Sequence, residues 1–188
     1  MEIERDFYLS KLVSRMGGDL VKVITGIRRC GKSYLLFNLF KRHLLQNGVK
    51  PGNIVEIALD ERKFQHLRDP LLLSRHISDA IKGRRGMKYV FIDEIQFSRK
   101  VLAPGVDLKS VAKEDRESCY VTFYDVLNEF RKMEDVDVYV TGSNSKMLSS
   151  DVATEFRGRG DEIRVHPLSF AEYLGVSGKD KQEALEEY

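Results

Sequence analysis

The sequence predicts an α/β fold of three layers, in which a parallel sheet of five strands carries helices on both faces. Short β-branched and apolar runs alternate with longer amphipathic runs along the 188 residues. This alternation is typical of parallel strands joined by crossover helices. The run at 89–92 is wholly apolar, as expected of a strand buried on both faces in the middle of such a sheet. A chain of this length forms one domain with a substantial core.

The predicted elements follow one another with clear boundaries. An N-terminal helix or arm over 1–19 has its apolar side at Phe7, Leu9, Leu12 and Val13. The spacing of Phe123, Val126, Leu127 and Phe130 at i, i+3, i+4 and i+7 predicts a helix there. The other predicted helices cover 33–45 and 70–82, the second begun by Pro70. The predicted strands cover about 20–25, 54–59, 89–92, 136–141 and 162–166.

Two segments stand apart from this alternation. Residues 97–119 are charged and without periodicity, which predicts a surface insertion, either ordered or mobile. The main domain is expected to span 20–175. Beyond it, 176–188 is predicted to be the start of a truncated C-terminal region, because a helix that begins near Lys179 is still running when the chain stops.

Composition narrows the class of protein. The net charge is +2, from 31 basic and 29 acidic side chains, so charge gives no indication of a nucleic-acid or anionic membrane partner. No apolar run approaches the roughly 18 residues that span a bilayer, and the charged N-terminus does not resemble a signal peptide. The two cysteines, Cys30 and Cys119, are predicted to be reduced thiols in a cytoplasmic protein. The histidines show no metal-ligand spacing.

Residues 26–33, Gly-Ile-Arg-Arg-Cys-Gly-Lys-Ser, match the phosphate-binding pattern G-x-x-x-x-G-K-[ST]. They lie between a predicted strand and a predicted helix, so successive backbone N–H groups and a helix N-terminus point at one anion site. Lys32 is expected to reach the β- and γ-phosphates, and the Ser33 hydroxyl to hold Mg²⁺. Arg28 and Arg29 either add charge beside the phosphates or face solvent or a partner. The predicted nucleotide-binding residues are Gly26, Arg28, Arg29, Cys30, Gly31, Lys32, Ser33 and Tyr34.

Two acids end the apolar strand at 89–92. In a parallel sheet the C-terminal strand ends face the ligand crevice. We expect Asp93 to bind Mg²⁺ opposite Ser33, and Glu94 to polarise the water that attacks the γ-phosphate. The alternative is that both acids only cap the following turn. The intact phosphate loop favours the metal and water roles.

Two further polar groups are candidates for catalysis. Ser143 or Asn144, just after the strand at 136–141, is predicted to hydrogen-bond the γ-phosphate or the water. The alternative is a glycine turn with a helix N-cap. Arg157 or Arg159 is predicted to place a cation on the transferring phosphate, from this chain or a neighbour. The alternative is that both arginines are simply solvated.

Four motifs occur in order: the phosphate loop at 26–33, Phe-Ile-Asp-Glu-Ile-Gln at 91–96, Thr-Gly-Ser-Asn at 141–144, and Pro-Leu-Ser-Phe-Ala-Glu-Tyr at 167–173. Together they resemble the AAA-type, archaeal-ATPase-like P-loop ATPases of prokaryotes, whose AAA domain precedes a C-terminal domain of uncharacterised function. The resemblance covers about 3–175. It implies an ASCE-type sheet, with an extra strand between the phosphate-loop strand and the acid strand. It also implies Asp93 for magnesium, Glu94 for catalysis and a polar sensor near Ser143.

This chain departs from the family pattern in two places. The 97–119 stretch is longer than the usual link, and the chain stops at Tyr188 where family members usually continue, as a fragment or a short form would. The predicted function is ATP hydrolysis with Mg²⁺ as a motor or switch, and the alternative is a nucleotide-binding regulatory module with little turnover. ATP is favoured over GTP because no Asn-Lys-x-Asp motif follows a strand. The expected partners are ATP and a second copy of the chain, without a membrane.

Overall fold

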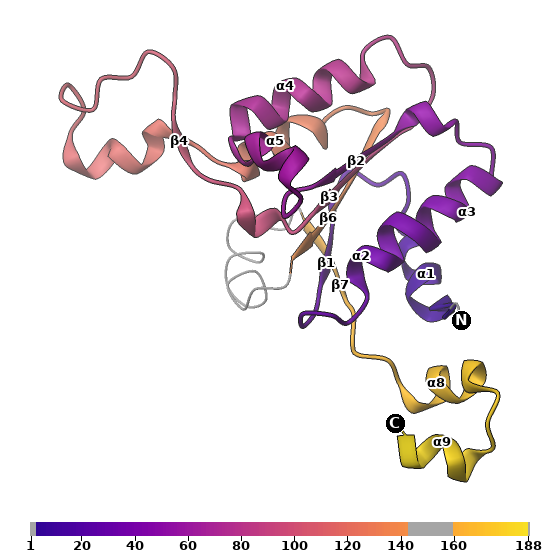
Figure 1. Cartoon of the computed structure of the whole chain (residues 1–188). Coiled ribbons are helices and arrows are strands. Elements are labelled where there is room, and N and C mark those ends of the chain that lie inside the picture. Colours follow the sequence, from indigo (N-terminus) through magenta and orange to yellow (C-terminus); the bar gives the residue numbers. More distant parts are fainter. Residues whose placement is uncertain (1–2, 143–159, 188) are drawn as a thin grey trace.

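The computed structural model describes residues 3–142 and 160–187 and confirms the predicted α/β class (Figure 1). Five strands form one sheet in which every pairing is parallel. They are β1 (Val21–Thr25), β2 (Ile54–Ala58), β3 (Lys88–Asp93), β6 (Val136–Gly142) and β7 (Gly160–Arg164).

The strand order is β2-β3-β6-β1-β7, so β6 lies between the strand that enters the phosphate loop and the strand that ends in the acids. This is the arrangement that the resemblance implied. In the register, Ile92 of β3 is opposite Val140 of β6, and Thr25 of β1 is opposite Gly142. The C-terminal ends of β1, β3 and β6 therefore reach the same edge of the sheet at the same level.

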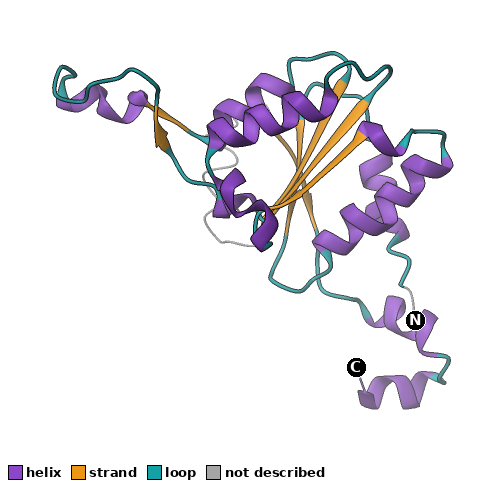
Figure 2. Cartoon of the chain, turned by 45° about the horizontal axis from the view of Figure 1, so that its top comes forward, coloured by secondary structure: helices purple, strands orange, loops and turns teal. Residues whose placement is uncertain are grey.

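Helices cover both faces of the sheet (Figure 2). One face carries α4 and α5, and the other carries α1 and the helix that follows the phosphate loop. Asp69 begins α4 by accepting hydrogen bonds from the N–H groups of Leu71 and Leu72, with Pro70 in the first turn. The helices are α1 (Asp6–Val13), α2 (Lys32–Tyr34), a π-helical stretch (Leu35–Phe40), α3 (Lys41–Gln46), α4 (Pro70–Ile81) and α5 (Phe123–Phe130). Short 3-10 helices cover Pro51–Asn53, Arg62–Arg68 and Ile95–Phe97.

The two faces of the sheet bury different side chains. The α4 and α5 face is mainly aliphatic, whereas the other face centres on three aromatic rings. The Phe40 ring lies 4.8 Å from the Tyr139 ring and 5.7 Å from that of Phe91. Rings at these distances add to the stability that burial alone provides.

The N-terminal helix α1 differs from the sequence prediction at one residue. Leu12 is buried and Leu9 and Val13 pack against the same core, as predicted. Tyr8 is buried as well, whereas Phe7, predicted on the apolar side, is 63% exposed. Tyr8 and Leu12 are four positions apart and share one helix face, and Phe7 lies roughly 100° away from Tyr8. Tyr8 also bonds through its hydroxyl to the segment after β7, which favours this orientation.

The 97–119 segment extends away from the sheet as an arm (Figures 1 and 2). Two short antiparallel strands lie at its base, β4 (Val101–Leu102) and β5 (Tyr120–Val121), and a 3-10 helix covers Lys113–Cys119. None of residues 97–119 is buried. The arm is held by its own local pairing and contributes no side chain to either core, and the sequence did not predict its two strands.

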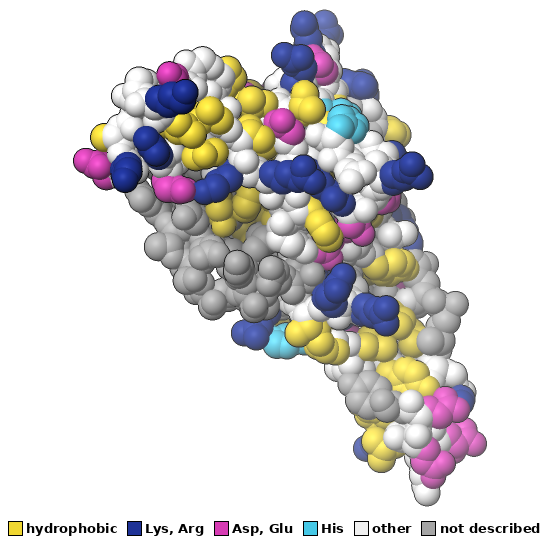
Figure 3. Space-filling model, turned by 60° about the vertical axis from the view of Figure 1, so that its left-hand side comes forward, with side chains coloured by type: hydrophobic (Ala, Val, Ile, Leu, Met, Phe, Trp, Pro, Cys, Tyr) yellow, Lys and Arg dark blue, Asp and Glu magenta, His cyan; other side chains and the backbone are white. Residues whose placement is uncertain are grey.

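After β7 the chain forms two helices, α8 (Phe170–Ser177) and α9 (Lys181–Glu187), which project from the sheet domain (Figure 1). No side chain of α8 is buried. Acidic side chains gather at the end of this projection (Figure 3). Within residues 3–142 and 160–187, no helix combines the length and the apolar character needed to cross a membrane.

Candidate nucleotide site

The phosphate loop connects β1 to α2, and its glycines occupy positions that a side chain would block. Gly26 has φ +148°, and a Cβ there would lie 2.3 Å from the carbonyl oxygen of Val165 and 2.8 Å from the Cys30 Sγ. Gly31 has φ +91°, in the region that favours glycine. The loop therefore brings its backbone close to the end of β7 without a side chain between them.

Lys32 lies inside the loop. Its side chain is 4% exposed, and its Nζ donates to the carbonyl oxygens of Gly26 at 3.1 Å and Ile27 at 2.9 Å. The ammonium group is thus held among the atoms that form the anion cradle. Arg28 and Arg29 are exposed, and Arg29 has a positive φ of 64°.

Asp93 meets two hydroxyl groups at the edge of the sheet. Ser33 Oγ donates to its Oδ1 at 3.0 Å, and the Thr141 hydroxyl donates to the same oxygen. Asp93 is 5% exposed, and this burial raises the pKa of its carboxyl group. The hydrogen bonds from Thr141 and Ser33 oppose the rise, and the nearby charges of Glu94 and Asp60 add to it.

Glu94 begins the turn after β3 with a positive φ of 52°. Its backbone N–H donates to Thr141 Oγ1 at 3.1 Å, and its carboxylate accepts a hydrogen bond from Gln96 Nε2. The side chain is half-buried. Glu94 therefore lies next to Asp93 at the loop edge, with its backbone fixed by the neighbouring strand.

Thr141 is the residue that sequence reasoning missed. It lies one residue before the end of β6 and is fully buried. Its hydroxyl contacts the Asp93 carboxylate and the backbone N–H of Glu94. Sequence reasoning placed the polar sensor at Ser143 or Asn144, which lie outside the described residues, as do Arg157 and Arg159. The sequence signal was its place at the start of the Thr-Gly-Ser-Asn motif. The register, which pairs Ile92 with Val140, brings the next residues, Asp93 and Thr141, into contact.

The oxygen atoms of Ser33 and Asp93 fit a magnesium ion. A hydroxyl and a carboxylate are hard oxygen ligands, and they already lie within hydrogen-bonding distance of each other. Over 3–142 and 160–187 no group of three or more His, Cys, Asp or Glu side chains forms a metal cage. Magnesium usually binds through one or two protein ligands and completes its shell with water and phosphate oxygens. This site provides that kind of ligand set.

A pocket of about 400 Å³ opens beside the loop. Its apolar lining comes from Ile3, Tyr34 and Leu168, and two cationic residues, Arg5 and Arg29, also line it. The backbone of the loop at Gly31 forms part of its wall. The pocket therefore continues from the phosphate cradle onto an apolar surface, as a phosphate-bearing ligand with a flat ring would require.

Comparison with known proteins points to one family. A family model described as "AAA domain" matches residues 19–174. An uncharacterised protein of Haemophilus influenzae is 31% identical over 183 residues, which is 97% of this chain and 40% of that protein. The uncharacterised protein MJ1544 of Methanocaldococcus jannaschii is 31% identical over 158 residues, which is 82% of this chain and 28% of that protein. The chain thus spans less than half the length of these relatives.

Solved structures with the same fold include an ORC1 protein and a DnaA protein. The Aeropyrum pernix ORC1 protein in complex with DNA aligns with a TM-score of 0.54 at 13% identity, over 100% of this chain and 50% of ORC1. AMPPCP-bound DnaA from Aquifex aeolicus aligns with a TM-score of 0.51 at 14% identity, over 96% of this chain and 49% of DnaA. At these identities the likeness concerns the fold.

Proposed function

The chain belongs to the family of AAA domains, and on this premise we propose that it binds ATP with Mg²⁺ and hydrolyses it to ADP and phosphate, as a motor or switch. The observation that carries the proposal is the contact of Ser33 and Thr141 with Asp93 at the edge of the sheet, directly beside the phosphate loop. A structural turn has no need of a buried carboxylate with a raised pKa at this point.

Each side chain has a role in this proposal. Backbone N–H groups of the loop hold the phosphates, and Lys32 exchanges its two carbonyl contacts for the β- and γ-phosphate oxygens. Ser33 and Asp93 hold Mg²⁺, which when bound neutralises phosphate charge. Glu94 orients the attacking water and accepts its proton. The Thr141 hydroxyl positions the Asp93 carboxylate and the Glu94 backbone through its two hydrogen bonds.

The pocket beside the loop suits the base of the nucleotide. Tyr34 offers an aromatic ring, and Ile3 and Leu168 offer apolar side chains near the wall formed by Gly31. Stacking on an aromatic ring contributes about 1–3 kcal/mol per base. We propose that this pocket holds the adenine ring, which matches the absence of an Asn-Lys-x-Asp guanine motif from the sequence.

The proposal extends to assembly and location. A second copy of the chain would bring Arg157 or Arg159 to the phosphate of its neighbour as the transferring group leaves. A cytoplasmic location agrees with two cysteines that are both free thiols. The C-terminal domain that the resemblance implies stays a prediction. The biological process of the longer relatives is a property of the full-length proteins and is not assigned to this chain.

Replacing Lys32 with alanine tests nucleotide binding directly. Lys32→Ala removes the cation placed inside the phosphate cradle, so ATP binding should weaken at least about tenfold, or about 1.4 kcal/mol. The measurement is a titration with a fluorescent ATP analogue at fixed Mg²⁺. Lys41→Ala is the matched control, because Lys41 lies in the same helical stretch but pairs with Glu56 at 2.5 Å. Equal affinity for Lys32→Ala and the parent would contradict the site.

A further inference from the structure

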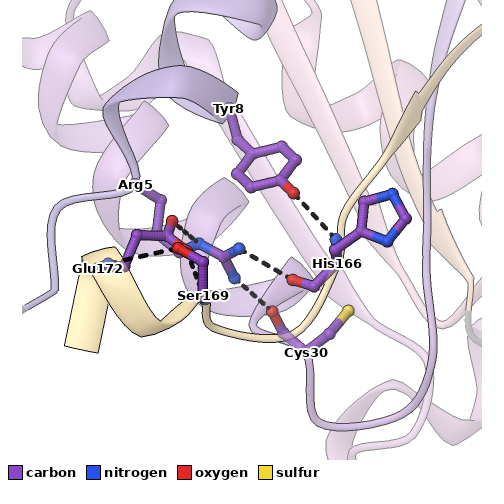
Figure 4. A network of polar contacts seen from close by, with 6 residues as sticks. All are labelled: Arg5, Tyr8, Cys30, His166, Ser169 and Glu172. Carbon is purple, nitrogen blue, oxygen red and sulfur yellow. Dashed lines mark hydrogen bonds and ion pairs between the residues drawn. The ribbon is translucent and has the colours of Figure 1, made fainter. Parts of the chain in front are cut away.

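Arg5 joins three parts of the chain that are far apart in sequence (Figure 4). Its Nη1 donates to the carbonyl oxygen of Cys30 at 2.8 Å, and its Nη2 to that of His166 at 2.8 Å. Its Nε donates to Glu172 Oε1 at 2.9 Å. The guanidinium thus connects the N-terminal segment, the phosphate loop and the segment that leads into α8.

Arg5 is buried, so the stability of the folded chain depends on these hydrogen bonds. The residue is only 5% exposed, and its guanidinium carbon lies 4.6 Å from the centre of the Tyr8 ring. A buried cation is tolerated when it is paired and hydrogen-bonded, and removing it leaves its acceptors without donors. Loss of the Arg5 side chain would therefore break all three hydrogen bonds at once.

The contact with Cys30 orients a peptide of the phosphate loop. The peptide bond between Cys30 and Gly31 is trans, so its carbonyl and its N–H point in opposite directions. Because the Cys30 carbonyl oxygen points toward Arg5, the Gly31 N–H is directed away from Arg5. A Cβ on Gly31 would lie 3.5 Å from Arg5 Nη1, which places the guanidinium directly against this turn.

The contact with Glu172 reaches the start of α8. Glu172 Oε2 accepts from the N–H and the hydroxyl of Ser169, each at 2.8 Å, and forms the capping box of the helix. Burial by itself raises the pKa of Glu172, but the bonds from Ser169 and the charge of Arg5 lower it overall. Nearby, the N–H of His166 donates to the Tyr8 hydroxyl at 3.1 Å.

We propose that Arg5 is a positioning residue that couples occupancy of the phosphate loop to docking of α8 on the sheet domain. Through Arg5, the ion pair with Glu172 links the first turn of this helix to the Cys30 carbonyl of the loop. A phosphate bound to the loop N–H groups favours the same orientation of the Cys30–Gly31 peptide that Arg5 favours. This inference rests on the proposed nucleotide site.

Coupling of this kind is reciprocal. If nucleotide strengthens the docking of α8, then loss of the contact at α8 must weaken nucleotide binding by the same factor. The hydrogen bonds of Glu172 go to Arg5 and Ser169, and neither residue belongs to the phosphate loop. A change at Glu172 therefore reports the coupling without altering the residues that hold the nucleotide.

The test measures hydrogen exchange of the 170–177 amides with and without ATP and Mg²⁺, together with ATP affinity. In the parent, ATP should slow this exchange about fivefold or more, the lower end of typical allosteric couplings. Arg5→Ala and Glu172→Gln should each abolish the effect of ATP on exchange and weaken ATP binding by a matching factor. Arg15→Ala is the matched control. The Nε of Arg15 lies 2.7 Å from Asp161 Oδ2 of β7, and this ion pair does not involve the phosphate loop.

The outcomes separate this inference from the proposed function. A parent chain that binds no nucleotide would contradict both. A parent that binds ATP while ATP leaves the exchange of α8 unchanged would overturn the coupling alone, as would unchanged ATP affinity in Glu172→Gln. If Arg5→Ala does not fold, Arg5→Lys replaces it. Arg5→Lys keeps the charge but cannot reach three acceptors in one plane, so it should also lose the effect of ATP.

Discussion

At the residue scale, one hydroxyl group organises the acids of the site. The Thr141 hydroxyl donates to Asp93 and accepts from the backbone N–H of Glu94. Both contacts cross from β6 to β3 and are buried or half-buried. Thr141 therefore positions the Asp93 carboxylate and the backbone of Glu94.

Replacing Thr141 with valine should lower turnover more than nucleotide affinity. Valine matches the shape of threonine but removes the hydroxyl that accepts from the Glu94 N–H and donates to Asp93. We expect phosphate release to fall about tenfold or more while the Kd for ATP changes little. Thr141→Ser keeps the hydroxyl and should recover most of the rate. Equal turnover in Thr141→Val and the parent would contradict the role of Thr141.

Replacing Asp93 with asparagine should stabilise the chain in the absence of nucleotide. Burial raises the pKa of Asp93 in the folded state, so the folded chain binds more protons than the unfolded chain between the two pKa values. Stability contributed by this group therefore decreases as the pH rises from about 4, the ordinary value of an aspartate, through the raised pKa. Asparagine removes the buried charge and still accepts from Ser33 and Thr141.

Asp93→Asn should therefore raise the Tm of the nucleotide-free chain at neutral pH. Differential scanning calorimetry with and without Mg²⁺ measures it. Mg²⁺ with ATP should raise the Tm of the parent strongly and that of the variant little, because the variant lacks a metal ligand. A variant less stable than the parent would show that the carboxylate stabilises the apo fold instead.

At the scale of elements, the sequence predicted regular structure well and long-range contacts poorly. Glycine and proline boundaries and apolar runs placed all five strands of the sheet, because these signals are local. Phe7 was assigned to the buried side of α1, but the orientation of that helix depends on Tyr8 bonding beyond β7. Arg5 was not singled out at all, since its partners lie 25, 161 and 167 positions away.

The arm should be the first site of cleavage in the native state. It carries Lys109, Lys113 and Arg116, and none of residues 97–119 is buried. Limited trypsin digestion followed by mass spectrometry should find the first cuts at these residues, because local opening there disrupts no core contact. Cleavage should leave the Tm of the nicked chain nearly unchanged. Early cleavage within α4 or α5 in place of the arm would contradict this expectation.

At the scale of the whole molecule, the sheet order determines what the edge can do. Placing β6 between β1 and β3 brings the phosphate loop, a hydroxyl and two acids to one edge. The C-terminal helices project on the far side of the loop from the arm (Figure 1). In the proposed coupling, a change in the phosphate loop reaches α8 through the contacts of Arg5 with Cys30 and Glu172. The arm contributes no side chain to the core.

The most direct test of the proposed ATPase compares Glu94→Gln with the parent in two assays, ATP binding and phosphate release with Mg²⁺. Glutamine keeps the shape of Glu94 but loses the base, so ATP should bind with nearly the parent affinity while turnover falls about 10²-fold or more. Glu117→Gln is the control. Glu117 lies on the arm, where its Oε2 is 2.7 Å from Lys100 Nζ and far from the phosphate loop. Phosphate release at the parent rate by Glu94→Gln would contradict the assignment of the base. ATP binding without any release by the parent would make the chain a nucleotide-binding module.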